Sequence, residues 1–230
     1  LFRSTSMCTA VLKDIISYYT CRNTNVYCCM IDATKAFDRI KYDKLFQILL
    51  ERKLSPIVIR LLFDLYTRQK TCTFWNGNYS EYFNSSNGIR QGGVLSPILF
   101  TLYIDVLINR LVNADIGCHI GGNYYGVLAY ADDLTILCPS ARGLQQMLDI
   151  CVKFGEEYDV KFNSKKTVCI GFTGGPVMPK CKAVMGNEEI KWDTCVKHLG
   201  NYINFNLDES AEIINKRGNF IGDGNCMRSE

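Results

Sequence analysis

The sequence predicts an α+β fold in which an antiparallel β-sheet packs against helices. Three observations lead to this fold class. Segments with the hydrophobic spacing of helices alternate with short apolar runs, an Asn76-Gly77 turn signal sits between two β-type segments, and no linker, repeat or low-complexity tract divides the chain. Because 47% of the 230 residues are hydrophobic, the chain can form a sizeable core, and wholesale disorder is excluded as its general state.

The expected elements follow the order helix, strand, two helices, hairpin, helix, hairpin, helix and strands. Apolar residues every three or four positions predict the helices, and short apolar or alternating runs predict the strands. Pro56 stands at the favoured first position of the third helix, and Ser96-Pro97 marks the start of the fourth. The helices are expected at residues 7–22, 42–54, 55–69, 96–114 and 141–160, with a further one beginning at residue 210, and the strands and hairpins at residues 25–33, 70–86, 124–140, 161–172 and 197–205.

Charge and cysteine content restrict the class of protein. The net charge of +3 permits nucleic-acid binding without arguing for it. None of the twelve cysteines forms a Cys-x-x-Cys pair and only two histidines are present, so we expect no zinc. No signal peptide or membrane span is recognisable. The sequence therefore predicts a reduced, intracellular protein of the cytoplasm and/or nucleus with no membrane partner.

Three aspartates are the first candidates for chemistry. Asp32 ends one predicted strand, and Asp132 and Asp133 sit in the expected turn, Ala131 to Asp133, of a later hairpin. If the strands are neighbours, three carboxylates converge at one edge of the sheet, and hard divalent cations would neutralise them. The alternative is that Asp-Asp makes an ordinary turn, since aspartate favours turns.

Five stretches, taken in order, resemble the motifs of reverse transcriptases, most closely the non-LTR retrotransposon type, with group II intron enzymes next. The stretches are DATKAFDRI (32–40), GIRQGGVLSPILF (88–100), YADD (130–133), FNSKKT (162–167) and KHLGNYI (197–203). The resemblance implies a polymerase palm-type antiparallel sheet packed on helices. It also implies an RNA-directed DNA polymerase that takes dNTPs, an RNA template and a DNA primer.

The resemblance implies catalytic or metal-binding roles for several of the matched residues. Asp32 and Asp132 would be the main ligands of two Mg²⁺ ions, for which Mn²⁺ is a possible substitute. Asp133 would be the third carboxylate, and the Ala33 carbonyl would assist. Lys166 would donate a proton to the leaving pyrophosphate, although a solvated strand-end lysine is the alternative. These ions would support in-line nucleotidyl transfer to a primer 3′-hydroxyl.

Further matched residues would bind substrate. Phe37 would lie under the sugar, where a bulky ring excludes a 2′-hydroxyl, and Ala36 would let the sugar approach; a core aromatic is the alternative for Phe37. Gln91 and Gly92 would contact the incoming nucleotide and the template base. Arg90 is either a phosphate contact or a solvated loop arginine.

Two more stretches would hold the primer. Tyr130 and Ala131 precede the carboxylates and would contact primer or sugar, with plain strand packing as the alternative for Tyr130. His198, Leu199 and Gly200 would form the turn that holds the primer end.

The resemblance also implies how the chain is organised. The expected parts are the end of the fingers at 1–24, palm with the first carboxylate motif at 25–40, fingers and palm helices with a hairpin at 41–87, palm at 88–205 and the start of a truncated thumb at 206–230. The chain is expected to be a segment of a longer protein and to have little activity alone. A decayed palm that only binds nucleic acid or protein and an RNA-dependent RNA polymerase are the competing hypotheses.

Overall fold

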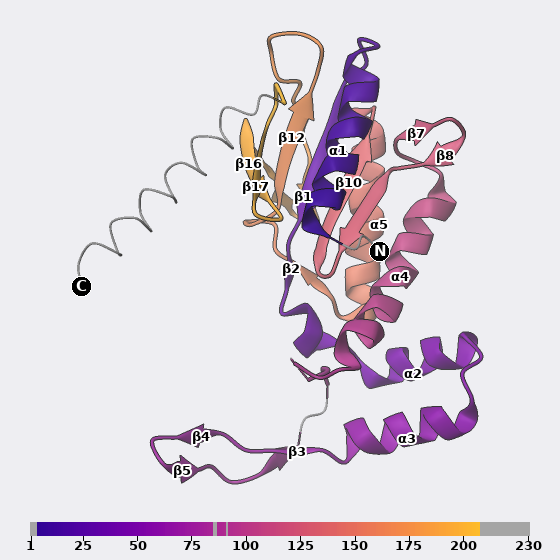
Figure 1. Cartoon of the computed structure of the whole chain (residues 1–230), viewed down its shortest axis with the longest axis vertical. Coiled ribbons are helices and arrows are strands. Elements are labelled where there is room, and N and C mark those ends of the chain that lie inside the picture. The colour runs from indigo at the N-terminus through magenta and orange to yellow at the C-terminus, as the bar shows by residue number, and fades with distance from the viewer. Residues whose placement is uncertain (1–3, 85–86, 91, 208–230) are drawn as a thin grey trace. The chain divides into compact units, whose positions relative to one another are not determined.

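The computed structural model describes residues 4–84, 87–90 and 92–207 (Figure 1). The chain forms two compact units, each built from segments that are distant in sequence. The first unit comprises Leu1–Asp32, Leu111–Val152 and Phe162–Glu230, and the second comprises Ala33–Arg110 and Lys153–Lys161. The expected thumb residues 206–230 and the helix predicted from residue 210 lie almost wholly outside the described residues.

A five-stranded sheet forms the centre of the first unit. The strands lie in the order β15 (Lys191–Trp192), β12 (Val168–Phe172), β1 (Val26–Ile31), β10 (Asp133–Cys138) and β9 (Val127–Tyr130). Neighbours are antiparallel except β12 and β15, which run parallel over two residue pairs. The predicted antiparallel sheet packed on helices is confirmed. The parallel edge strand β15 was not predicted, because a two-residue strand carries too little sequence pattern to be recognised.

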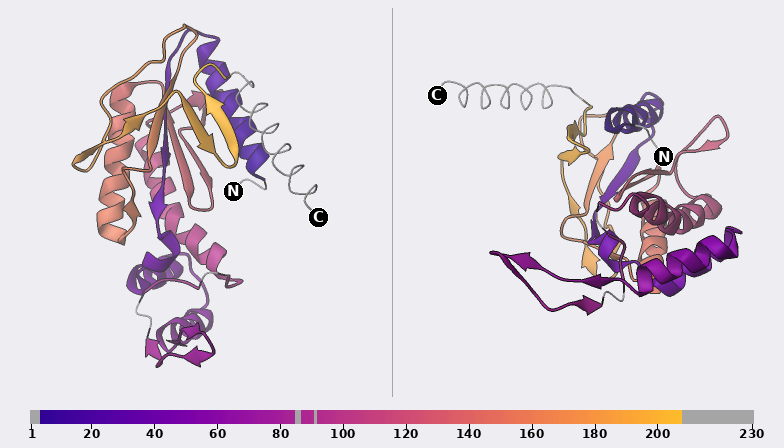
Figure 2. Two further views of the ribbon diagram at one scale, coloured as in Figure 1. Left: turned by 90° about the vertical axis from the view of Figure 1, so that its left-hand side faces the viewer. Right: turned by 60° about the horizontal axis from the view of Figure 1, so that its bottom comes forward.

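Helices cover both faces of this sheet (Figure 2). Helix α1 (Thr5–Thr20) begins after Ser4, whose hydroxyl accepts a hydrogen bond from the Met7 amide at 3.2 Å. Its Leu12 and Ile16 join Cys28 of β1 in one buried cluster. Cys29, on the other face of β1, lies near Cys151 of α5 (Ala141–Tyr158). Strand β1 is thus buried on both sides, which explains its continuous apolar run.

Small hairpins complete the first unit. Strands β16 (Cys195–His198) and β17 (Asn201–Asn204) form the hairpin expected near residues 197–205. Two further hairpins were not predicted: β7 (His119–Ile120) with β8 (Asn123–Tyr124), and β13 (Val184–Met185) with β14 (Glu188–Glu189). The strand expected at 161–172 is interrupted, because a turn between Asn163 and Thr167 separates β11 (Lys161–Phe162) from β12.

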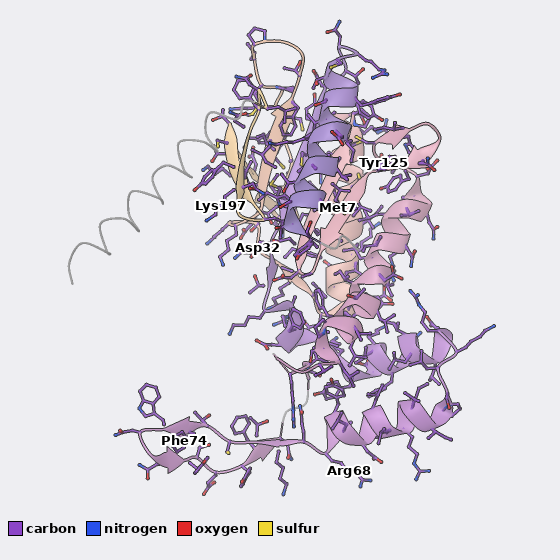
Figure 3. All side chains as sticks on the ribbon, in the orientation of Figure 1. Met7, Asp32, Arg68, Phe74, Tyr125 and Lys197 are labelled. Atoms are coloured by element: carbon purple, nitrogen blue, oxygen red, sulfur yellow. The ribbon has the colours of Figure 1, made fainter. Side chains whose placement is uncertain are left out.

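The second unit is mainly helical. It contains β2 (Ala33–Thr34), the 3₁₀ helix η1 (Ala36–Arg39), α2 (Tyr42–Glu51), α3 (Pro56–Thr67) and most of α4 (Ser96–Ala114). Strands β3 (Lys70–Thr71) and β4 (Phe74–Trp75) pair with β6 (Phe83–Asn84) and β5 (Asn78–Tyr79) in an exposed hairpin, on which Phe74 is labelled in Figure 3. Positive φ angles of 48° and 82° at Asn76 and Gly77 confirm the predicted turn.

Helix α4 is long and apolar enough to cross a membrane by length and composition. A core helix passes the same test, so this is weak evidence against the prediction of no span. Phe100, Tyr103 and Leu107 of α4 are almost fully buried. Asp105 and Arg110 on the same helix form ion pairs with Arg52 and Glu157. Helix α4 thus buries one apolar face and carries ion-paired side chains elsewhere on its surface.

Candidate active site

Strand register brings the first and third carboxylate motifs together in the first unit. Ile31 pairs with Leu134 at the end of β1 and β10, so the next residues on the two strands are Asp32 and Asp133. On the other side of β1, the Asp32 amide donates a hydrogen bond to the Thr167 hydroxyl at 3.3 Å, beside Lys166. Two carboxylates and one ammonium group therefore stand at the ends of three adjacent strands.

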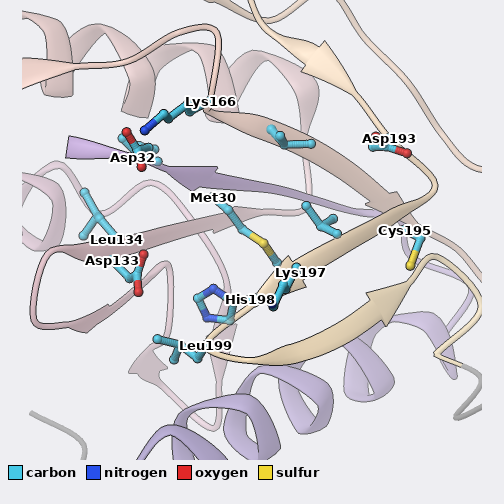
Figure 4. Close-up of a pocket in the computed structure, with 13 residues that line it drawn as sticks. Met30, Asp32, Asp133, Leu134, Lys166, Asp193, Cys195, Lys197, His198 and Leu199 are labelled. Atoms are coloured by element: carbon cyan, nitrogen blue, oxygen red, sulfur yellow. The ribbon is translucent and has the colours of Figure 1, made fainter. Parts of the chain in front are cut away.

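A pocket of about 350 Å³ opens at these strand ends. Asp32, Asp133 and Lys166 line it together with residues 195–199 of the β16–β17 hairpin (Figure 4). Asp132 does not line the pocket; it is exposed in the turn before β10. The sequence prediction that Asp32 and the YADD motif meet is confirmed as a matter of geometry, whereas the catalytic roles of these residues stay predictions.

The carboxyl group of Asp133, which lines this pocket, has a raised pKa. Partial burial of the carboxyl group raises the pKa of Asp133, and the negative charges of Asp132 and Asp32 raise it further. Concentrated carboxylate charge is the donor chemistry that a hard divalent cation requires. Within the described part of the chain, no group of three or more His, Cys, Asp or Glu side chains is gathered closely enough to hold a metal ion. The donor set thus fits such an ion by charge and atom type, without a closed coordination sphere.

The YADD turn differs in detail from the expected one. Asp133 already belongs to β10 and pairs with Tyr130 of β9, so the turn consists of Ala131 and Asp132 alone. Ala131 has a φ of 52°, in the left-handed region that non-glycine residues rarely occupy. Tyr130 is half-buried against the apolar cluster that includes residues of α1 and β1, and its contact with primer or sugar stays a prediction.

The β16–β17 hairpin borders the same pocket. Leu199 and Gly200 form its turn, with φ angles of 49° and 82°, and His198 is the last residue of β16. The His198 side chain is buried, its Nε2 has no hydrogen-bond partner among the described residues, and burial lowers its pKa to about 4. Lys197 also lines the pocket with Asp32 (Figure 4). It was not singled out from the sequence, where a polar residue in a short alternating strand is the only signal that could have indicated it.

The predicted sugar-binding residues lie in the second unit. Ala36 is buried in η1, and Lys35 directly before it has a φ of 48°. Ala33, predicted as a carbonyl donor to the metal ion, is half-buried in β2 of the same unit. The Phe37 ring stacks on the Phe100 ring, with centroids 4.5 Å apart and an interplanar angle of 21°. This contact holds the Phe37 ring in one orientation, as both a steric gate and a core aromatic would require.

The glycine-rich loop packs against η1 in the same unit. The Gly88 amide donates to the Ile40 carbonyl at 2.9 Å, and the Ile89 amide donates to the Phe37 carbonyl at 2.8 Å. Arg90 and Gly92 follow and are exposed, while Gln91 lies outside the described residues. The structure thus brings Ala36, Phe37 and Arg90 together in one unit, and Asp32, Asp133 and Lys166 together in the other.

Comparison with known families gives one match over most of the chain. The family model described as reverse transcriptase (RNA-dependent DNA polymerase) matches residues 2–203. The Pol polyprotein of the type-2 retrotransposable element R2DM of Drosophila melanogaster is 29% identical over 73% of the chain and 16% of that protein. The RNA-directed DNA polymerase from the mobile element jockey of Drosophila funebris is 27% identical over 79% of the chain and 20% of that protein. The chain therefore spans about a fifth of the length of these relatives.

Solved structures with a similar fold come from telomerases. Apo telomerase from Candida tropicalis, truncated from its C-terminal domain, superposes with a TM-score of 0.63 at 17% identity, covering 90% of this chain and 40% of that one. Telomerase from Candida albicans in complex with a TWJ fragment of telomeric RNA gives a TM-score of 0.65 at 12% identity, covering 87% and 33%. At these identities the similarity concerns the fold, and it agrees with the predicted palm-type architecture.

Proposed function

Since the chain belongs to the reverse transcriptase (RNA-dependent DNA polymerase) family and is of the non-LTR retrotransposon type, we propose that its parent protein is an RNA-directed DNA polymerase. The reaction is transfer of a deoxynucleotide from a dNTP to the 3′-hydroxyl of a DNA primer on an RNA template. One observation carries the proposal: Asp32, Asp133 and Lys166 line one pocket, where partial burial, followed by the charges of Asp132 and Asp32, raises the pKa of Asp133.

The carboxylates supply the ligands that the reaction needs. The family implies dependence on a divalent metal ion, and we propose that the ions are two Mg²⁺, replaceable by Mn²⁺. Asp32, Asp132 and Asp133 would hold them, with the Ala33 carbonyl as a further donor. When bound, the ions would lower the pKa of the primer hydroxyl and stabilise charge on the leaving pyrophosphate.

The other residues position substrates and move a proton. Lys166, in the pocket beside Asp32 and Asp133, would protonate the leaving pyrophosphate. The hairpin turn of Leu199 and Gly200 would hold the primer end, with Tyr130 and Ala131 near the primer sugar. Gln91 and Gly92 would contact the nucleotide pair being formed. No covalent nucleophile is required, because positioning and charge stabilisation account for this class of reaction.

Phe37 would select deoxynucleotides. Its ring is fixed by the stack on Phe100, so it cannot turn aside for a 2′-hydroxyl, and the small Ala36 beside it leaves room for the sugar. We further propose that the protein acts inside the cell, in the cytoplasm and/or nucleus, since a template RNA and a chromosomal target would be found there.

Primer extension on an RNA template with a DNA primer, Mg²⁺ and dNTPs tests the proposal. The protein is the longest reading frame that contains this chain, with Asp132→Ala and Phe37→Val beside it. We expect extension that Asp132→Ala abolishes and that Phe37→Val opens to rNTPs. Extension that survives Asp132→Ala refutes the site assignment, and an rNTP preference in the unaltered protein refutes the DNA polymerase in favour of an RNA polymerase.

A catalytically inactive palm is the remaining alternative. It predicts a folded parent protein that binds template–primer and extends nothing under any of these conditions. The two carboxylates that line one pocket argue against it. Partial burial and the charges of Asp132 and Asp32 raise the pKa of Asp133, and perturbed pKa values of this kind gather at functional sites.

A further inference from the structure

A chain of hydrogen bonds in the second unit fixes the side chain of Arg90. The Arg90 Nε donates to the Gln69 Oε1 at 2.9 Å, and the Gln69 Nε2 donates to the Tyr42 hydroxyl at 3.3 Å. The Tyr42 hydroxyl in turn donates to the Gly88 carbonyl at 2.8 Å, inside the protein. The Arg90 carbonyl is also held, because it accepts from the Ser96 hydroxyl and from the Gly93 amide. An exposed loop arginine is thereby fixed at both its backbone and its side chain.

The bond to Gln69 occupies one edge of the guanidinium group. In the part of the chain that the structure describes, no hydrogen bond or ion pair involves the Arg90 Nη1 or Nη2 atoms. These two atoms carry four N–H donors in a planar fork, the geometry that binds the oxygens of a phosphate in a bidentate manner. Holding the fork in place in advance reduces the ordering cost of binding.

The held arginine borders a polar pocket of about 330 Å³. Asp38, Gln69 and Thr71 line it with Arg90. A carboxylate here disfavours a small free anion, but it suits a ligand that combines a phosphate with hydrogen-bond donors, as a nucleotide does with its hydroxyl and amino groups. The pocket therefore matches one nucleotide unit better than an isolated phosphate ion.

We propose that this pocket is a phosphate-binding subsite for a nucleotide, in which Arg90 contacts the phosphate and Gln69 and Tyr42 are positioning residues for Arg90. The inference rests on the proposed polymerase function for its ligand class. The phosphate belongs either to the backbone of the bound template–primer or to the triphosphate of the incoming dNTP. These sources share one chemistry and are separable by experiment.

The test uses the full-length parent protein and two measurements. The first is the dissociation constant of a fluorescent RNA-template/DNA-primer duplex without dNTP, over a range of salt concentrations. The second is the KM for dNTP in primer extension. The variants are Arg90→Gln, Gln69→Leu and, as a matched control, Arg60→Gln, which removes the same charge from an exposed position of α3 in the same unit. Circular dichroism and thermal unfolding verify that each variant is folded.

If the phosphate is in the nucleic-acid backbone, Arg90→Gln weakens duplex binding about fivefold to tenfold and reduces the slope of log K against log salt by about 0.7 to 0.9, the value for one lost phosphate contact. If it is in the dNTP, the dissociation constant is unchanged and the KM rises by a similar factor. Gln69→Leu keeps the charge of Arg90 but no longer holds its side chain in place. It should therefore raise whichever constant Arg90→Gln raises, the dissociation constant of the duplex or the KM for dNTP, about threefold.

Two results would overturn the inference. One is that Arg90→Gln changes neither quantity more than Arg60→Gln does, which would make Arg90 a solvated arginine. The other is that Gln69→Leu has the same dissociation constant for the duplex and the same KM for dNTP as the unaltered protein, which would show that Gln69 does not position Arg90. Duplex binding is measured without catalysis. A protein that binds the duplex but does not extend the primer would refute the polymerase function, and the effect of Arg90→Gln on the dissociation constant could still be measured.

Discussion

Replacing Gly88 with alanine should destabilise the protein and loosen the loop that carries Arg90. Gly88 is buried with a φ of 87°, where any L side chain is strained. A Cβ atom there would lie 2.8 Å from the carbonyl oxygen of Asp38 and 3.0 Å from the Asp38 C and Cα atoms. These are backbone atoms of η1, which cannot rotate away, so the loop has to move.

The magnitude follows from two contributions. A non-glycine residue in the left-handed region costs about 1 kcal/mol, and forcing a methyl group into a well-packed site costs about 1 to 3 kcal/mol more. We expect Gly88→Ala to lower the free energy of unfolding by about 2 to 4 kcal/mol. Gly77→Ala is the matched control, because Gly77 has a φ of 82° but nothing within 4 Å of its Cβ position; it should cost about 1 kcal/mol.

Urea unfolding followed by far-ultraviolet circular dichroism measures both variants. The difference between them isolates the contact with η1. Gly88→Ala should also reproduce part of the binding loss of Arg90→Gln, since the Tyr42 hydroxyl donates to the Gly88 carbonyl. If Gly88→Ala is no more destabilising than Gly77→Ala, the close packing of the loop on η1 is refuted.

Two further predictions concern ionisable groups. Burial and the charges of Asp132 and Asp32 raise the pKa of Asp133 in the folded protein, so the stability of the fold decreases as rising pH ionises this carboxyl group. Asp133→Asn should therefore raise the melting temperature in EDTA. Added Mg²⁺ should stabilise the unaltered protein more than the variant. A melting temperature lowered by Asp133→Asn in EDTA would contradict this. His198 has a folded-state pKa of about 4 because of burial, against a usual value of 6.5, so the unfolded chain takes up the proton first and stability falls as pH is lowered through this window. Between pH 8 and pH 5 the loss should be about 2 kcal/mol, measured by urea unfolding, and His198→Leu should lack that part of the pH dependence, whereas an unchanged dependence in the variant would show that other groups cause it.

The parts of the fold that sequence predicted well are those with strong local signals. The long helices have a hydrophobic period that no other structure satisfies, and Asn76-Gly77 is a turn because both residues tolerate positive φ angles. Ala131 has a positive φ angle with no glycine or asparagine beside it, so the pairing of β9 with β10 imposes this turn. Leu199 also has a positive φ angle, and Gly200 follows it in the same turn. Strand β15 has two residues and pairs in parallel, and its formation depends on β12 rather than on its own sequence.

The candidate site was predictable to a similar extent. The order of motifs placed Asp32 near YADD, and the register of β1 and β10 confirms that proximity. The position of Asp133 inside β10 depends on a two-residue turn that the sequence does not favour. The hydrogen bond from Arg90 to Gln69 joins residues that are 21 positions apart. No periodicity or turn rule connects such positions, so only the folded loop reveals it.

Strand β1 explains why two like charges, those of Asp32 and Asp133, can be held beside each other. Its residues are buried on both faces, with Cys28 and Cys29 fully buried between α1 and α5. A slip of one residue would exchange every side chain between the two faces, so packing on both sides specifies the register strongly. Asp32 follows directly after this strand, so packing of the strand holds it beside Asp133 and Lys166 even when no cation is bound to the two carboxylates. The apolar core supplies the stability that the raised pKa of Asp133 removes, and a bound cation would return it. Small cysteine side chains suit this strand because they fill both faces without forcing its neighbours apart.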